Sequence, residues 1–218
     1  MIEEKEQKEK KLNSIRCKVI LVGDSGVGKT SIISRYLKKY DPTVKATLTT
    51  SFFSKIEYFN NYRIKFEIWD TVGQEQYRSL NNLFFKDAHI CIIVYDITRA
   101  ESFDNIKNYW YESVLTNGLE GIIFGIAGNK NDLYEYEQVD KEEVKDFCNE
   151  INAILKFTSA KDNFCIDDLF KELGNKFINS DFMKEALENY TEWEEEKKLK
   201  IGDNNDQNNI KKVKKGCC

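Results

Sequence analysis

Short runs of apolar residues, each bounded by polar residues, recur along the chain and predict the strands of a sheet. The runs at 88–96 and 122–128 are apolar at nearly every position, which is typical of strands buried on both faces. Segments with helical spacing of apolar residues lie between several runs. The predicted strands are 16–22, 51–59, 63–69, 88–96, 122–128 and 153–158, and the predicted helices are 31–39, 102–115, 140–150 and 166–178.

The order of these elements predicts an α/β fold. Strands alternate with helices almost throughout, and this pattern favours a mainly parallel, six-stranded sheet with helices on both faces. Asn60-Asn61-Tyr62 separates two adjacent strand-like runs and suits a tight hairpin, which adds one antiparallel edge strand. Ser102 is the expected N-cap of its helix.

Composition divides the chain into three parts and argues against a nucleic-acid-binding or secreted protein. Residues 1–14 carry mixed charge and read as a disordered arm, residues 15–180 hold the folded domain, and residues 181–218 form a charged tail. The net charge of −4 argues against general nucleic-acid binding. The charged N-terminus argues against a secretory signal. The internal cysteines are expected to be buried thiols: Cys17, Cys91, Cys148 and Cys165.

A glycine-rich motif follows the first predicted strand. Residues 23–30 read GDSGVGKT and fit the pattern GxxxxGK[ST] of a phosphate-binding loop, whose backbone N–H groups turn inward around phosphate oxygens. We expect Lys29 to contact the β- and γ-phosphates and the Thr30 hydroxyl to bind Mg²⁺. The other interpretation of the string is a glycine-rich turn without a ligand. The candidate nucleotide-binding residues are Ser25, Gly26, Val27, Gly28, Lys29, Thr30 and Ser31.

A second motif, WDTVGQE at 69–75, ends the third predicted strand. Asp70 suits the acidic residue that holds Mg²⁺, directly or through water. The N–H of Gly73 can approach a γ-phosphate, and the Gln74 amide both donates and accepts, as needed to orient an attacking water in catalysis. The motif resembles the WDTAGQE signature of Ras-like small GTPases. It departs from that signature at Val72, whose β-branched side chain is expected to slow hydrolysis or exchange.

The resemblance implies a second switch segment within residues 40–50. There the family places one threonine whose hydroxyl reaches Mg²⁺ and whose backbone meets the γ-phosphate. We choose Thr47, with Thr49 as the alternative, because residues 46–52 are similar to the S-T-I-G-x-x-F string of the Rab family. Tyr40 is the aromatic residue expected to shield the guanine edge.

Two later motifs suit recognition of guanine. Asn129-Lys130-Asn131-Asp132 follows a buried strand, and the Asp132 carboxylate can accept hydrogen bonds from the N1–H and N2–H₂ groups that adenine lacks as a pair. Asn129 can bridge neighbouring loops, and the Lys130 stem can lie on the base. Residues 158–161 resemble the SAK loop of the same family, which implies contacts from Ser159, Ala160 and Lys161; the alternative is a simple strand end.

Within the small GTPases the chain resembles the Rab family, over residues 16–178. The segment 95–103 (YDITRAESF) is similar to the Rab YDIT…ESF segment, and residues 77–80 are similar to the endosomal branch. Phe52, Trp69 and Phe84 fall where Rab proteins carry an aromatic triad that effectors read. Core packing is the alternative role of these three side chains.

The end of the chain resembles the paired cysteines of Rab proteins. Cys217 and Cys218 follow a lysine-rich segment, and the resemblance implies that both receive geranylgeranyl chains. Two lipids give durable anchoring, and lysines favour anionic membranes. The expected location is the cytoplasmic face of an intracellular membrane, endosomal or another vesicle, in exchange with the cytosol.

These expectations describe a Mg²⁺-dependent GTPase switch in vesicle-mediated traffic with the P-loop small-GTPase fold. The resemblance implies effectors of the GTP form, an exchange factor, a GTPase-activating protein, a prenyl escort and a GDP-dissociation inhibitor as partners, and no nucleic acid. Because the sequence around the site suggests no arginine finger, hydrolysis should be slow without the activating protein. The alternatives are a GTP-loaded effector-binding scaffold with negligible hydrolysis, suggested by Val72, and a P-loop ATPase or kinase.

Overall fold

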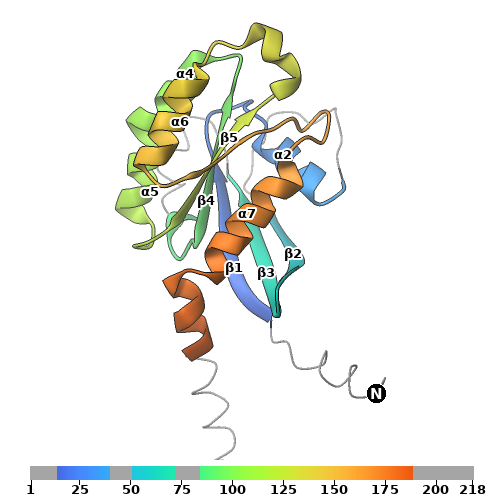
Figure 1. Ribbon diagram of the computed structural model, residues 1–218, viewed down its shortest axis with the longest axis vertical. Coiled ribbons are helices and arrows are strands. Elements are labelled where there is room, and N and C mark those ends of the chain that lie inside the picture. The colour runs from blue at the N-terminus through green and yellow to red at the C-terminus, as the bar shows by residue number, and fades with distance from the viewer. Residues whose placement is uncertain (1–13, 40–50, 72–83, 189–218) are drawn as a thin grey trace, which may run out of the picture. The chain divides into compact units, whose positions relative to one another are not determined.

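The computed structural model describes residues 14–39, 51–71 and 84–188. The chain divides into two units, Met1–Ile178 and Asn179–Cys218. The first contains the sheet and the helices that cover it (Figure 1). In the second, residues 181–188 are helical. Among the described residues, no helix combines the length and the apolar character needed to cross a lipid bilayer.

Six strands form one sheet in the order β2-β3-β1-β4-β5-β6. All neighbouring pairs are parallel except β2 and β3, which are antiparallel, so the predicted architecture is confirmed. The hairpin between β2 and β3 leaves only Asn60 and Asn61 outside the strands, and Asn60 takes a positive φ of 51°, which Asn tolerates in tight turns. The strands are β1 (Ser14–Val22), β2 (Ser51–Phe59), β3 (Tyr62–Asp70), β4 (Ile90–Asp96), β5 (Ile123–Asn129) and β6 (Ile154–Phe157).

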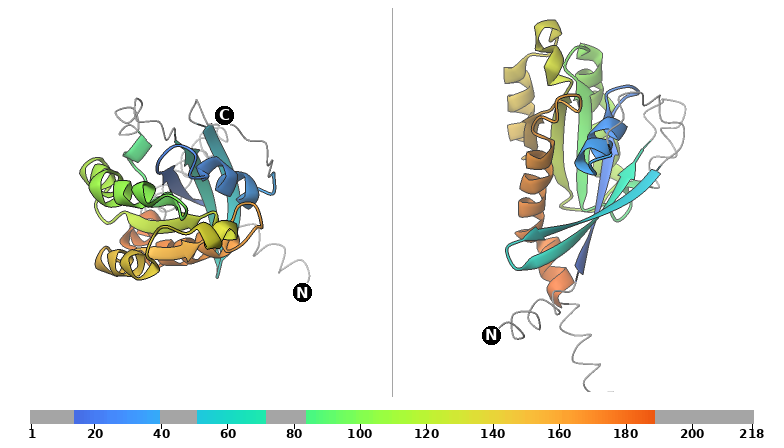
Figure 2. Two further views of the ribbon diagram at one scale, coloured as in Figure 1. Left: turned by 90° about the horizontal axis from the view of Figure 1, so that it is seen from above. Right: turned by 90° about the vertical axis from the view of Figure 1, so that its right-hand side faces the viewer.

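The helices cover the two faces of the sheet. Helices α2 and α7 lie on one face, where Leu173 of α7 packs so closely on Gly125 of β5 that a Cβ there would lie 3.0 Å from its side chain (Figures 1 and 2). Helices α4, η2, α5 and α6 pack on the other face around Trp110 and Tyr95. The bounds are α2 (Lys29–Tyr36), α4 (Ala100–Asn105), η2 (Ile106–Trp110), α5 (Tyr111–Asn117), η3 (Asn131–Tyr136), α6 (Lys141–Glu150) and α7 (Ile166–Ile178).

The helix predicted over 102–115 differs most from the structure. It begins at Ala100, its N-cap Arg99 makes no side-chain capping bond, and residues 106–110 form a π-helical turn. The prediction that Ser102 is the N-cap is therefore wrong; its hydroxyl donates to the carbonyl of Arg99 at 2.7 Å and accepts from the N–H of Asp96 at 3.0 Å. Ser102 fastens the helix to the end of β4 from within its first turn.

The cysteine prediction is correct for three of the four internal thiols. Cys17, Cys91 and Cys148 are free and buried, and burial raises the pKa of Cys148 to about 12. Cys165 is free but only partly buried. It lies just before α7 at a positive φ of 53°, so it belongs to a surface turn and not to the core.

Candidate functional site

The glycine-rich loop 23–30 joins the end of β1 to the start of α2. Gly23 has a φ of +134° and lies against β4, where a Cβ would come within 2.1 Å of the Val94 carbonyl oxygen. Glycine is therefore required there for both conformation and space. Ser25 and Gly26 are exposed at the crest of the loop, Val27 is buried, and Ser31 is partly buried on the helix. The loop thus presents its backbone to solvent while its ends are fixed in the fold.

Lys29 folds back over the loop. Its Nζ donates to the carbonyl of Gly23 at 2.6 Å and to the carbonyl of Asp24 at 2.8 Å, and the side chain is nearly buried. Burial lowers the pKa of Lys29 to about 8, although nearby Asp70 and Asp24 act in the opposite direction. A buried ammonium whose hydrogen-bond partners among the described residues are carbonyl oxygens is well suited to a phosphate anion.

Thr30 and Asp70 converge beside Lys29. The Thr30 hydroxyl donates to Oδ2 of Asp70 at 2.5 Å. Asp70 ends β3 and is almost completely buried, and its Oδ1 has no hydrogen-bond partner among the described residues. Burial raises the pKa of Asp70, against the effects of Thr30 and Lys29. A buried carboxylate oxygen without a partner next to a hydroxyl is the donor set that a hard cation prefers.

Asn129 connects the phosphate-binding loop to the loop after β6. Its Nδ2 donates to the carbonyl of Val27 at 2.8 Å, and its Oδ1 accepts from the Thr158 hydroxyl at 3.2 Å and from the N–H of Ala160 at 3.4 Å. A Cβ on Gly28 would lie 2.2 Å from Nδ2 of Asn129. The predicted bridging position of Asn129 is therefore present in the structure.

The other candidate base-recognition residues lie together at the same edge of the sheet. The Ser159 hydroxyl donates to Oδ1 of Asp132 at 2.6 Å, and Nζ of Lys161 lies 3.7 Å from Oδ2. Lys130 has a positive φ of 67°, and its Nζ donates to Asp96 at 2.6 Å. Burial acts to raise the pKa of Asp96, but hydrogen bonds from Lys130 and Thr98 outweigh it and lower the pKa.

Two arginines that the sequence did not indicate also contact loops of the site. Arg35 of α2 donates from Nε to the carbonyl of Ala160 and from Nη2 to the carbonyl of Lys161, both at 2.7 Å. Arg99 donates from Nη2 to the carbonyl of Ser25 at 3.1 Å. All three hydrogen bonds are with backbone oxygens of loops distant in sequence, so no local pattern predicts them.

Phe52, Trp69 and Phe84 form a row of contacting rings. The Phe52 and Trp69 rings meet edge to face with centroids 5.1 Å apart, and Trp69 and Phe84 are 5.7 Å apart. Phe52 is 50% exposed, whereas Trp69 and Phe84 are partly buried. The row thus combines packing with an exposed aromatic edge.

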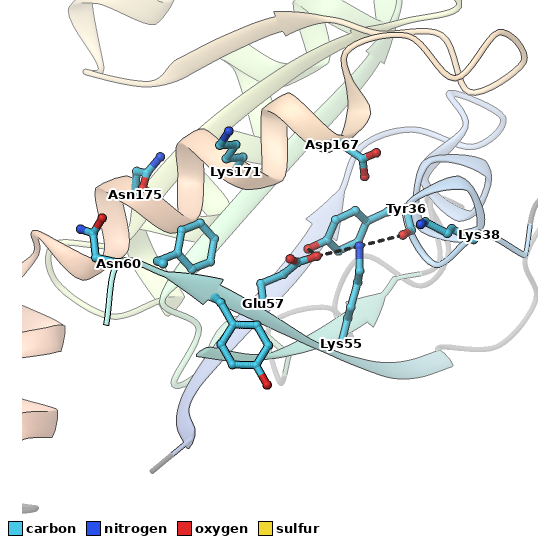
Figure 3. A pocket seen from close by; sticks show the side chains of 10 residues that line it. Tyr36, Lys38, Lys55, Glu57, Asn60, Asp167, Lys171 and Asn175 are labelled. Atoms are coloured by element: carbon cyan, nitrogen blue, oxygen red, sulfur yellow. Dashed lines mark hydrogen bonds and ion pairs between the residues drawn. The ribbon is translucent and has the colours of Figure 1, made fainter. Parts of the chain in front are cut away.

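A separate cavity of about 430 Å³ lies where α2, β2 and α7 meet (Figure 3). Two of its charged groups form an ion pair: Lys55 lies 2.7 Å from Glu57 and also donates to the Tyr36 carbonyl, and the Tyr36 hydroxyl donates to Glu57 at 3.0 Å. The Tyr36 ring stacks on Phe170 of α7 at 3.7 Å. These contacts fasten α2 to its neighbours at the end that precedes residues 40–50.

Several predicted residues lie outside the described part of the chain. They are Tyr40, Thr47 and its alternative Thr49, Val72, Gly73, Gln74, Cys217 and Cys218.

The six-stranded sheet, the loop before α2 and the loops 129–132 and 158–161 together define a P-loop protein of the small-GTPase class. The model of the Ras family matches residues 18–179. Rab-22A of Homo sapiens is 40% identical over 165 residues, which cover 75% of this chain and 84% of that protein. Rab5A of Oryza sativa subsp. japonica is 38% identical over 76% of this chain and 82% of its own length. RabJ of Dictyostelium discoideum is 36% identical over 85% of this chain and 71% of its own length.

The chain belongs to the Ras family and is a Rab-type small GTPase, an enzyme that hydrolyses GTP in the control of membrane traffic.

Proposed function

We propose that the phosphate-binding loop, Asp70 and the loops 129–132 and 158–161 form one guanine-nucleotide site with bound Mg²⁺. The observation that carries this proposal is the convergence of the Lys29 ammonium, the Thr30 hydroxyl and the buried Asp70 carboxylate where β1 and β3 end. A cation and hard oxygen ligands thereby lie at the mouth of a backbone loop suited to a triphosphate.

Thr30 and Asp70 would hold the metal, the carboxylate directly or through water. The unpaired Oδ1 of Asp70 supports this assignment, since a buried oxygen without a partner suits an external one. In the described part of the chain, no group of three or more His, Cys, Asp or Glu is placed to hold a metal ion. That fits Mg²⁺, which takes few protein ligands and completes its shell with phosphate oxygens and water. The ion would neutralise charge on the β- and γ-phosphates.

Asp132 is the proposed reader of the base. Ser159 holds its side chain in place with a short hydrogen bond, and Oδ2 lies at a longer distance of 3.7 Å from Nζ of Lys161. The Ala160 N–H is proposed to donate to the guanine carbonyl oxygen. Lys130, which donates to Asp96 in this structure, is proposed to lie along the base when nucleotide is bound.

The roles of the switch residues rest on the resemblance to the small GTPases. Thr47 is proposed to bind Mg²⁺ and the γ-phosphate, Gly73 the γ-phosphate, and Tyr40 to shield the base. Gln74 is proposed to orient the attacking water. Loss of the γ-phosphate would release both switch segments and change the surface that partners contact.

We also propose the partners and the membrane anchor in their finer form. Phe52, with Trp69 and Phe84, would contact effectors of the GTP form, because an exposed aromatic edge over a packed row is a rigid apolar anchor. Prenylated Cys217 and Cys218 would attach the protein to the cytoplasmic face of an endosomal or other vesicle membrane. An escort protein, a GDP-dissociation inhibitor, an exchange factor and an activating protein would control the cycle.

Identification of the nucleotide that co-purifies with the full chain tests the proposal directly. We expect GDP or GTP, and Mg²⁺-dependent turnover on the order of 10⁻⁴–10⁻² s⁻¹ without a partner. A bound adenine nucleotide, or unaided turnover of several per second, would contradict the assignment. For the anchor, the intact mass from eukaryotic cells should show two added geranylgeranyl groups, and a Cys217→Ser, Cys218→Ser variant should show none.

A further inference from the structure

The carboxylate of Asp24 is held from outside the phosphate-binding loop by one helical segment. Nε1 of Trp110 donates to Oδ1 at 2.9 Å, and Nδ2 of Asn105 donates to Oδ2 at 2.7 Å. Each carboxylate oxygen therefore receives one donor, and both bonds are to a charged acceptor, which makes them stronger than neutral ones. Trp110 is completely buried, so its N–H needs this partner or another within the protein.

The π-helical turn is what brings the two donors together. Residues five apart in an α-helix point about 140° apart around its axis, so Asn105 and Trp110 would lie on different sides. In η2 the Tyr111 N–H bonds to the carbonyl of Ile106, five residues back, and this wider turn brings side chains five residues apart closer to the same side of the helix. A short π-helical stretch within an α-helix is rare and frequently marks a functional position. Here it points two donors at a loop of the nucleotide site.

The residue that is held also anchors the lysine of the loop. The Asp24 carbonyl accepts a hydrogen bond from Nζ of Lys29 at 2.8 Å. Arg99, just before α4, binds the carbonyl of the next residue, Ser25. The segment 99–110 thus fixes two successive residues of the loop, one by its side chain and one by its backbone.

We propose that Asn105 and Trp110 are positioning residues for the nucleotide: through Asp24 they hold the phosphate-binding loop in the shape that retains GDP and GTP. Neither side chain needs to touch the nucleotide. They act on the loop, whose backbone N–H groups must keep their directions to bind phosphate. This inference rests on the proposed function of the loop.

The test compares variants that remove one donor each and keep the packing. Trp110→Phe removes the indole N–H but retains a buried aromatic ring, and Asn105→Ala removes the amide at a partly buried position. Each should raise the dissociation rate of fluorescently labelled GDP by about tenfold at saturating Mg²⁺. Asn108→Ala, at an exposed position on the same π-helical turn, is the matched control and should leave the rate unchanged.

A double-mutant cycle separates positioning from general destabilisation. In an Asp24→Ala background the carboxylate is gone, so adding Asn105→Ala or Trp110→Phe should no longer raise the dissociation rate. Effects that persist in full in that background would overturn the proposal, as would unchanged rates in both single variants. If the unmodified chain binds no guanine nucleotide, the proposed function fails instead.

A spectroscopic measurement does not depend on nucleotide. In ¹⁵N-tryptophan-labelled protein, Trp110→Phe identifies the indole signal of Trp110, and Asp24→Ala should shift that signal and speed exchange of its proton with solvent. An indole signal that is insensitive to Asp24→Ala would show that the hydrogen bond is absent and would overturn the inference. Thermal unfolding of each variant confirms that it is folded.

Discussion

Asp132 and Asp70 are two largely buried carboxylates at opposite ends of the proposed site, and they differ in how far the protein completes their surroundings. Asp132 has a hydroxyl from Ser159 on one oxygen and Lys161 near the other. Asp70 has Thr30 on one oxygen and, among the described residues, nothing on the other. The surroundings of Asp132 are therefore organised by the protein's own hydrogen bonds, whereas Asp70 keeps an oxygen that suits the proposed cation.

The largest effect expected from this comparison is at Asp132. Asp132→Asn puts an amide group where the carboxylate accepts hydrogen bonds, so affinity for GDP should fall by roughly 10³-fold. Affinity for xanthosine diphosphate should rise, because its second carbonyl can accept from the new amide. Calorimetry with both nucleotides measures the exchange of preference. Asp162→Asn, an exposed position in the adjacent loop, carries the same charge change and should leave both affinities as they are.

Asp70→Asn should have a smaller effect that depends on the metal. Loss of the carboxylate should weaken the stabilisation of bound GDP by Mg²⁺ by about 10- to 100-fold. The GDP dissociation rate in excess Mg²⁺ and in chelator measures this. Because burial already raises the pKa of Asp70, the nucleotide-free variant should unfold at no lower temperature than the unmodified chain.

Equal Mg²⁺ dependence in Asp70→Asn and the unmodified chain would show that Asp70 is not part of the metal site. Asp168→Asn, on the exposed side of α7, is the control for the lost charge.

Lys29 should make nucleotide affinity depend on pH through the phosphate-binding loop, whereas Asp132 should not. Burial lowers the pKa of Lys29 to about 8, and phosphate favours its charged form, so nucleotide binding above that pH takes up a proton. Affinity for GDP should fall by about tenfold between pH 7 and pH 9. The unfolding free energy of the nucleotide-free chain should rise over the window from 8 towards the ordinary pKa, because there the unfolded state binds more protons.

Calorimetry at pH 8.5 in two buffers of different ionisation enthalpy measures the proton uptake. Identical apparent enthalpies in the two buffers would contradict the linkage.

The smallest effect is expected at Val72. Val72→Ala should raise single-turnover hydrolysis of GTP severalfold, since the β-branched side chain restricts a segment that is expected to move. Rapid quenching of preloaded protein measures the rate. Equal single-turnover rates in Val72→Ala and the unmodified chain would show that Val72 does not limit hydrolysis.

The strands and the nucleotide motifs could be predicted because their signals are local. Continuous apolar runs identified β4 and β5, and the spacing within residues 23–30 identified a loop between a strand and a helix. Asn129 could be placed because its motif follows a buried strand whose end lies at the edge of a parallel sheet.

The contacts that position the loop could not be predicted, because they depend on geometry that appears only in the folded chain. Asn105 and Trp110 have ordinary helical surroundings in the sequence, and nothing in that pattern indicates the π-helical turn that aligns them. Ser102 was predicted as the N-cap because serine often caps helices, but the helix begins two residues earlier. The Ser102 hydroxyl instead donates to the Arg99 carbonyl from within the first turn. Arg35 acts at a distance of more than a hundred residues in sequence, on Ala160.

Asn129 also sets a length. The ribose fixes the distance between the purine and the phosphates of any nucleoside di- or triphosphate. The parts of the protein that bind the base and the phosphates must therefore lie at a matching distance. The Asn129 amide bonds to Val27 on one side and to Thr158 and Ala160 on the other. It therefore determines the distance between the phosphate-binding loop and the proposed base-binding loop. A shorter or longer residue at position 129 should leave each of the two loops intact but change the distance between them, and so weaken the binding of every nucleotide.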